Sequence, residues 1–233
     1  MRDRDQSPVS RRARPAKPPL SRETIAAAAL RVVDAEGLGA LTMRRVAREL
    51  DTGAASLYVY VENREDLLAA MIDSELATVE NPTEGSWQEK VTALVQSQIA
   101  ALTRHRSLAV AALGAIPISP NASRVGEHLL NAVLESGVDQ RTAAWAVDLI
   151  GLWTSATAAE KTINDQRGAD GAVEADYLDR IDEYYRTLDP ADHPTTLAMR
   201  DLLLSGSDDQ RAAWGLGVIL NGILATPVPA PTE

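Results

Sequence analysis

Residues Thr42 to Tyr60 read TMRRVARELDTGAASLYVY, and this stretch decides the fold. Thr42 is a good N-cap, because its hydroxyl can accept from an unpaired amide of the first helical turn. The apolar residues after it recur at helical spacing, which predicts a first helix of about ten residues. These residues are Val46, Ala47 and Leu50.

The three residues that follow, Asp51-Thr52-Gly53, are poor in a helix interior. Gly53 is free to take positive φ and Asp51 can bond the local backbone, so the chain should turn here. A second short helix begins at Ala54 or Ala55, and the tyrosines Tyr58 and Tyr60 lie near its end. Two short helices around a tight turn are typical of a helix-turn-helix that enters the DNA major groove.

Helices on both sides complete a compact three-helix unit. Before the motif, Ser21 can cap a helix with an apolar stripe at helical spacing that ends at Gly37. After it, Asn63 can cap another helix, with Glu65 and Asp66 in the first turn where the helix dipole favours acids. This last helix should join the unit to the rest of the chain.

The charge is divided unevenly along the 233 residues. The net charge is −10, yet residues 1–64 carry 12 Lys and Arg against 8 Asp and Glu, a net +4, and the remainder carries 11 against 25, a net −14. A cationic end on an acidic body can bind phosphates locally while the body keeps away from DNA. A solvated, arginine-bearing surface is the alternative.

Residues 1–19 form a proline-broken basic tail that should be disordered when free. Its cations either follow the DNA backbone or enter an adjacent minor groove, with a tail that only keeps the chain in solution as the alternative. The cations nearest the prolines are Arg11, Arg12, Arg14 and Lys17.

Beyond the first unit, residues 20–80, the chain is predicted to be helical. Residues 81–86 hold a cluster of helix breakers and should be a linker, and residues 227–233 a proline-rich tail. Loops are expected at Gly168–Gly171 and Pro190–Pro194. Helices are expected at Trp87–Thr103, near Leu108, and at Arg124–Ser136, Arg141–Gln166, Val173–Leu188, Thr195–Leu204 and Asp209–Leu224. No strand pattern competes, so the predicted fold class is all-α.

The motif and its flanks resemble the N-terminal domain of the TetR (tetracycline-repressor-like) family of transcriptional regulators. The run from Leu57 through Tyr58, Tyr60 and Val61 to Asn63 and Arg64 is similar to the family's LYWHVxNK form. The resemblance covers about residues 20 to 80. It implies an all-helical homodimer whose larger C-terminal domain, residues 87–226, binds a small-molecule effector and sets the spacing of two DNA-reading units.

The resemblance also implies roles for single residues. Arg44 matches a base-reading position, and a guanidinium can engage guanine O6 and N7. Tyr58 and Arg64 match backbone contacts, which position rather than specify. Ala54 and Ala55 lack the hydrogen-bonding groups that relatives often carry there. The expected DNA contacts are Thr42, Arg44, Arg45, Ala54, Ala55, Ser56, Tyr58, Val59, Tyr60 and Arg64.

Two late helices have two-sided patterns that suggest a dimer, with ordinary packing within one chain as the alternative. The expected interface is Val147, Gly151, Thr154, Ala158, Gly215, Leu216, Ile219, Gly222 and Ile223. Bulky and polar residues are candidates for an effector pocket, although each type is also common in cores and on surfaces. These candidates are His105, Ile116, His128, Trp145, Leu149, Trp153 and Tyr184. Tetracycline itself is not implied, because Ser74–Asn81 contains no histidine.

Other function classes find little support in the sequence. There is no cysteine, the three histidines are scattered, and no catalytic or metal-ligand motif is present, so neither an enzyme nor a cofactor or metal is expected. No apolar run is long enough to span a bilayer. We expect a cytoplasmic, nucleoid-associated repressor that binds a pseudo-palindromic operator as a homodimer and is released by a small molecule. A helical protein-interaction adaptor is the alternative.

Overall fold

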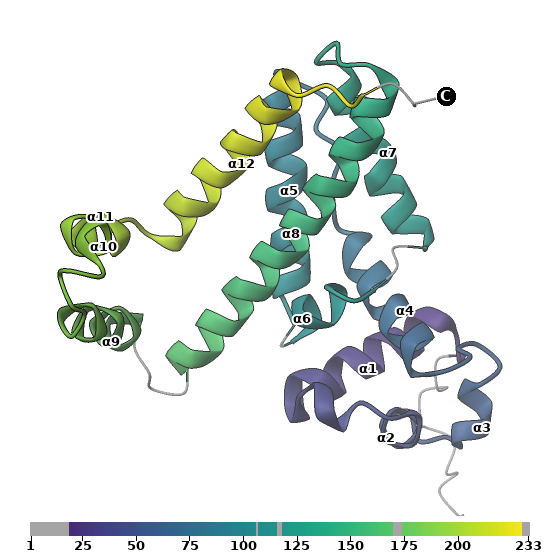
Figure 1. The fold of residues 1–233 in the computed structure, drawn as a ribbon. Coiled ribbons are helices and arrows are strands. Elements are labelled where there is room, and N and C mark those ends of the chain that lie inside the picture. The colour runs from purple at the N-terminus through teal and green to yellow at the C-terminus, as the bar shows by residue number, and fades with distance from the viewer. Residues whose placement is uncertain (1–18, 106, 116–117, 170–173, 230–233) are drawn as a thin grey trace, which may run out of the picture.

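The computed structural model describes residues 19–105, 107–115, 118–169 and 174–229. Within these ranges the chain is helical and contains no strand, which confirms the predicted class (Figure 1). The elements are α1 (Arg22–Glu36), η1 (Leu38–Ala40), α2 (Met43–Glu49), α3 (Ala54–Leu57), α4 (Arg64–Leu76), α5 (Trp87–Thr103), α6 (Leu108–Ala112), α7 (Pro120–Leu134), α8 (Gln140–Ala169), α9 (Glu174–Arg186), α10 (Pro194–Ala198), α11 (Arg200–Leu203) and α12 (Asp208–Ala225).

Helices α1 to α4 form one end of the molecule, the head (Figure 1). A capping box between Ser21 and Thr24 starts α1, whose apolar stripe packs against α4. Ile25, Val46 and Leu57 are fully buried at the centre of the head. Each of these three residues comes from a different helix, so the head has its own apolar core.

The turn between α2 and α3 is made differently from the prediction. Asp51, and not Gly53, takes the positive φ, at 49°, while Gly53 is extended at −82°. The amide of Asp51 donates to Arg48 O at 3.0 Å and that of Thr52 to Ala47 O at 2.9 Å. This is the Schellman arrangement, in which a left-handed residue ends the helix, and aspartate tolerates that conformation better than most residues.

Helices α5 to α12 form the body, in which α5, α7 and α8 pack on one another. A capping box between Ser86 and Glu89 starts α5, and the short α6 lies against α8. Ile72 of α4 packs against the core of the head and both apolar clusters of the body. Helix α4 is therefore the joint between head and body.

Helices α8 and α12 diverge from one another, and α9 to α11 lie between their far ends (Figure 1). The predicted helix at Thr195–Leu204 is two short helices divided at Met199. The first two residues of the loop expected at Gly168–Gly171 are helical, because α8 continues through Ala169; residues 170–173 lie outside the described ranges. The described part of the chain has no helix that is long and apolar enough to cross a membrane.

The structure describes the start of the C-terminal tail but almost none of the N-terminal tail. The basic tail lies outside the described residues, except for Pro19. The C-terminal segment packs on the start of α8, where Val228 N donates to Thr142 Oγ1 at 2.9 Å. Arg141 Nη1 donates to Pro229 O at 2.8 Å. At least through Pro229, the terminus is therefore held against the body.

Candidate nucleic-acid interface

The exposed side chains of the helix-turn-helix are held outward by two buried neighbours. Leu57 and Val61 lie four residues apart and are both buried in the head core. The three residues between them, Tyr58, Val59 and Tyr60, are exposed, and Val59 keeps 78% of its surface in water. A cluster of exposed aromatic and apolar side chains is unusual in a small domain, and contact with another molecule would explain it.

The neighbouring arginines of α2, Arg44 and Arg45, have different surroundings. Arg45 Nη2 lies 2.7 Å from Glu36 Oε1, and its Nη1 lies 3.1 Å from Glu49 Oε2. Arg44 is exposed, and no ion pair holds it to any other described residue. Of the two cations, Arg44 is the one that is free to meet a base or a phosphate.

A network of ion pairs holds α2 against α1. Glu49 accepts from Arg45 and, at 3.3 Å, from Nε of Arg31 on α1. Glu36 and then Glu49 raise the pKa of Arg45, while Arg45 and then Arg31 lower the pKa of Glu49. Both shifts favour the charged forms of Arg45 and Glu49. The predicted DNA contact Arg45 therefore positions α2 within the head.

Two further predicted contacts have local structural roles. The hydroxyl of Thr42 accepts from the amide of Arg45 at 3.1 Å, as expected of an N-cap. Arg64 Nε donates to Leu41 O at 3.2 Å, and its Nη2 donates to Leu38 O at 3.4 Å. Arg64 therefore fixes the turn that leads into α2.

Helix α3, the predicted recognition helix, is short and carries small side chains. Ala55 and Ser56 are exposed, whereas Ala54 is half-buried and packs on the head core. Arg48 is a further exposed cation that the sequence reasoning missed. It lies one helical turn after Arg44, so the i, i+4 spacing was the signal available for placing both on one face.

The candidate effector residues are spread over several elements of the body. His105 lies between α5 and α6 and contacts Asp34 and Glu75. His128 is half-buried on α7 and Tyr184 is exposed on α9. Ile116 lies outside the described residues. Trp153 of α8 packs beside Gly215 of α12.

Trp145 and Leu149 of that set line one groove, of about 850 Å³, between α8 and α12. The C-terminal segment, residues 226–229, forms one of its walls. The other principal apolar residues of this groove are Leu152, Ile219, Gly222 and Ile223. The groove is lined mostly by apolar side chains and is partly open to solvent.

The expected dimer residues are divided between the two sides of α8 and α12. Thr154 and Ala158 are buried within the single chain, where Thr154 Oγ1 donates to Ile150 O at 2.7 Å. The bulky side of α8, with Trp145 and Leu152, is the exposed one. The small residues of α8 therefore pack inward, since α5 and α6 approach on that side.

Comparisons with known proteins cover both parts of the chain. Residues 25–71 match the model of bacterial regulatory proteins of the tetR family, and residues 80–226 match the tetracyclin repressor-like C-terminal domain. The HTH-type transcriptional repressor DrrR1 of Streptomyces coeruleorubidus is 28% identical over 212 residues, 89% of this chain and 78% of that protein.

Solved structures of the Streptomyces coelicolor protein ActR have the same fold. Apo ActR aligns with a TM-score of 0.78 at 34% identity, over 89% of this chain and 98% of that one. ActR in complex with actinorhodin aligns with a TM-score of 0.79 at 34% identity, over 89% and 97%. With the exposed helix-turn-helix and both family models in agreement, the chain belongs to the TetR family of transcriptional regulators.

Proposed function

We propose that this chain is a homodimeric repressor that reads a pseudo-palindromic operator through α2 and α3 and leaves it when a small organic effector binds the body. The observation that carries the proposal is the helix-turn-helix surface, where Tyr58, Val59 and Tyr60 stand exposed beside the unpaired Arg44. Its action is regulatory rather than catalytic, and its place is on the chromosome in the cytoplasm.

Within this proposal the DNA contacts divide by function. Arg44 reads a base in the major groove, where a guanidinium pairs best with guanine. Tyr58, Ser56 and Arg48 contact the phosphate backbone and set the register. Arg45 acts through the ion pairs that hold α2.

The dimer interface is proposed on the exposed face of α8 and α12. Trp145, Leu149 and Leu152 of α8 and Trp214 and Val218 of α12 are all large, apolar and exposed. Large apolar side chains exposed in such number on two neighbouring helices favour a contact with another molecule. In a two-fold dimer the same face meets its own copy, so the helices of the partner subunit would fill the α8/α12 groove.

The effector is proposed to be a small organic molecule, because ActR, which shares the whole fold, has been solved in complex with actinorhodin and with (S)-DNPA. For release, the effector must bind more tightly to the dimer shape that does not fit the operator. A ligand with equal affinity for both shapes would leave repression unchanged.

The test begins with selection of binding sites from a randomised duplex by the full-length protein. Affinity for the selected duplex and for a random duplex is then measured by fluorescence anisotropy over a series of salt concentrations. We expect the selected site to show two inverted half-sites and both affinities to fall steeply with salt, since phosphate contacts release counterions. Equal, salt-insensitive binding of both duplexes would instead support the adaptor alternative.

A further inference from the structure

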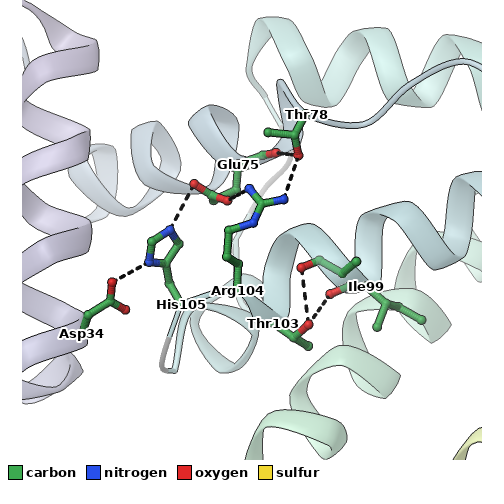
Figure 2. A network of polar contacts seen from close by, with 8 residues as sticks. Asp34, Glu75, Thr78, Ile99, Thr103, Arg104 and His105 are labelled. Atoms are coloured by element: carbon green, nitrogen blue, oxygen red, sulfur yellow. Dashed lines mark hydrogen bonds and ion pairs between the residues drawn. The ribbon is translucent and has the colours of Figure 1, made fainter.

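His105 lies at the turn between α5 and α6, where the body meets the head (Figure 2). Its Nδ1 is 2.7 Å from Asp34 Oδ2, near the end of α1. Its Nε2 is 3.2 Å from Glu75 Oε1, near the end of α4. One imidazole of the body therefore contacts carboxylates on two helices of the head.

Glu75 is a buried carboxylate, with 9% of its side chain exposed. Its second oxygen, Oε2, accepts from Nη1 of Arg104, whose Nη2 lies 3.4 Å from Thr78 Oγ1 (Figure 2). A buried charge is costly unless it is paired, so this carboxylate depends on both neighbours. Arg104 keeps its charge at every working pH, which leaves His105 as the partner whose charge can change.

The imidazole completes both contacts in one protonation state only. Carboxylates accept hydrogen bonds, so each ring nitrogen must carry a proton to donate, and that form is the imidazolium. A neutral ring has one N–H, and its other nitrogen would turn a lone pair towards a carboxylate oxygen. Loss of the proton therefore breaks one of the two contacts.

The burial of the two acids indicates which contact is lost. The side chain of Asp34 is 42% exposed, so water can replace the imidazole there. Glu75 is closed off from water and should keep the remaining N–H. The released contact would then be the one to α1.

Within the described ranges, charged groups of three elements lie close to this ring. Asp34 approaches from α1, Glu75 from α4, and Arg104 from the same turn as His105. Helix α6 carries no titratable side chain, and from α8 the neutral amide of Gln166 donates to Ser107 Oγ at 3.2 Å. The ring therefore lies mainly between two anions.

We propose that His105 is a positioning residue that, as the imidazolium, clasps α1 of the head to the body and, as the neutral ring, releases it. Acid would then fix the orientation of the head, and alkali would loosen it. The clasp acts on head orientation and makes no contact with DNA. A result that refutes the clasp would therefore leave the proposed operator binding standing.

The absence of cysteine makes a direct test possible, because introduced cysteines can be labelled without background. Ala27→Cys on α1 and Gln96→Cys on α5 place spin labels at exposed positions of head and body. Doubly labelled chains are mixed with an excess of unlabelled chains, so that only distances within one subunit are read by pulsed electron resonance. Spectra are recorded at about pH 5.5 and about pH 8.5, on either side of the ordinary histidine range.

We expect the distance distribution of the otherwise unchanged chain to broaden at the higher pH. His105→Gln, which cannot be protonated, should show the broad distribution at both pH values. Asp34→Asn, which removes an exposed carboxylate and should not disturb folding, should also lose the pH response. His193→Gln is the matched control, because that histidine is exposed before α10, and it should respond like the unchanged chain.

Two results would overturn the proposal. One is a distance distribution of the unchanged chain that is the same at both pH values. The other is a pH response that persists in His105→Gln, since the response would then belong to another group. Thermal unfolding of each variant at both pH values shows that the compared proteins are folded.

Discussion

Replacement of Trp145 by alanine tests the proposed dimer interface. The Trp145 residue is 64% exposed in the single chain. A tryptophan buries up to roughly 250 Å², so association can remove about 160 Å² from water, worth about 4 kcal/mol at roughly 25 cal/mol per Å². Two-fold symmetry doubles this to about 8 kcal/mol. Allowing for incomplete coverage and for the alanine that remains, we expect a loss of roughly 4 kcal/mol, or about a thousandfold weaker dimerisation.

Sedimentation equilibrium over a range of protein concentrations measures this change directly. A matched pair of leucines provides the control, because Leu149 and Leu113 are each 46% exposed, and only Leu149 lines the α8/α12 groove. Leu149→Ala should weaken dimerisation and Leu113→Ala should not. If Trp145→Ala left the dimer intact, or if both leucine variants had the same effect, the interface would lie elsewhere and the reasoning from exposed apolar surface would be refuted.

Three further predictions follow from the head. Arg44→Ala should reduce discrimination at one operator base pair by roughly 1–3 kcal/mol, measured by competition between operator variants; an equal loss on random DNA would remove its specifying role. Asp51→Val should cost about 1–2 kcal/mol in urea unfolding, because a β-branched residue resists positive φ, whereas Gly53→Ala at φ −82° should be nearly neutral. The Arg22 guanidinium lowers the pKa of Asp66 below its ordinary value of 3.8, so their pairing stabilises the head above that pH and is lost as the pH falls below it. Asp66→Asn should therefore flatten the acid side of the stability profile, and an unchanged profile would show that the pair contributes little.

Local signals in the sequence located most of the helices. The predicted bounds Trp87–Thr103 coincide with α5, because a Ser86–Glu89 capping box and an uninterrupted apolar stripe both act within a few residues. Ser21, Thr42 and Asn63 cap their helices as expected for the same reason. The break at Met199 was missed, since no glycine or proline marks it.

The resemblance of the helix-turn-helix predicted which region should contact DNA. It did not predict which side chains are exposed and which are held in ion pairs within the chain. The resemblance singled out Arg44 as the base reader, but Arg44 and Arg45 are adjacent and chemically identical, so the sequence did not show that only Arg45 would be held in ion pairs. Glu36 and Glu49 make the difference, and their approach depends on how α1 packs against α2. His105 is a similar case, because Asp34 lies 71 residues earlier in the chain.

The sequence by itself determined the all-α class, the helix-turn-helix and the family, because capping, helical periodicity and motif spacing are properties of short segments. It also showed that α8 has one small-residue face and one bulky face. Only the tertiary structure decided which face is covered: Thr154 and Ala158 pack inward, and Trp145 and Leu152 stay exposed. Periodicity fixes which residues share a face of a helix, but the neighbour that covers that face comes from elsewhere in the chain or from a second copy.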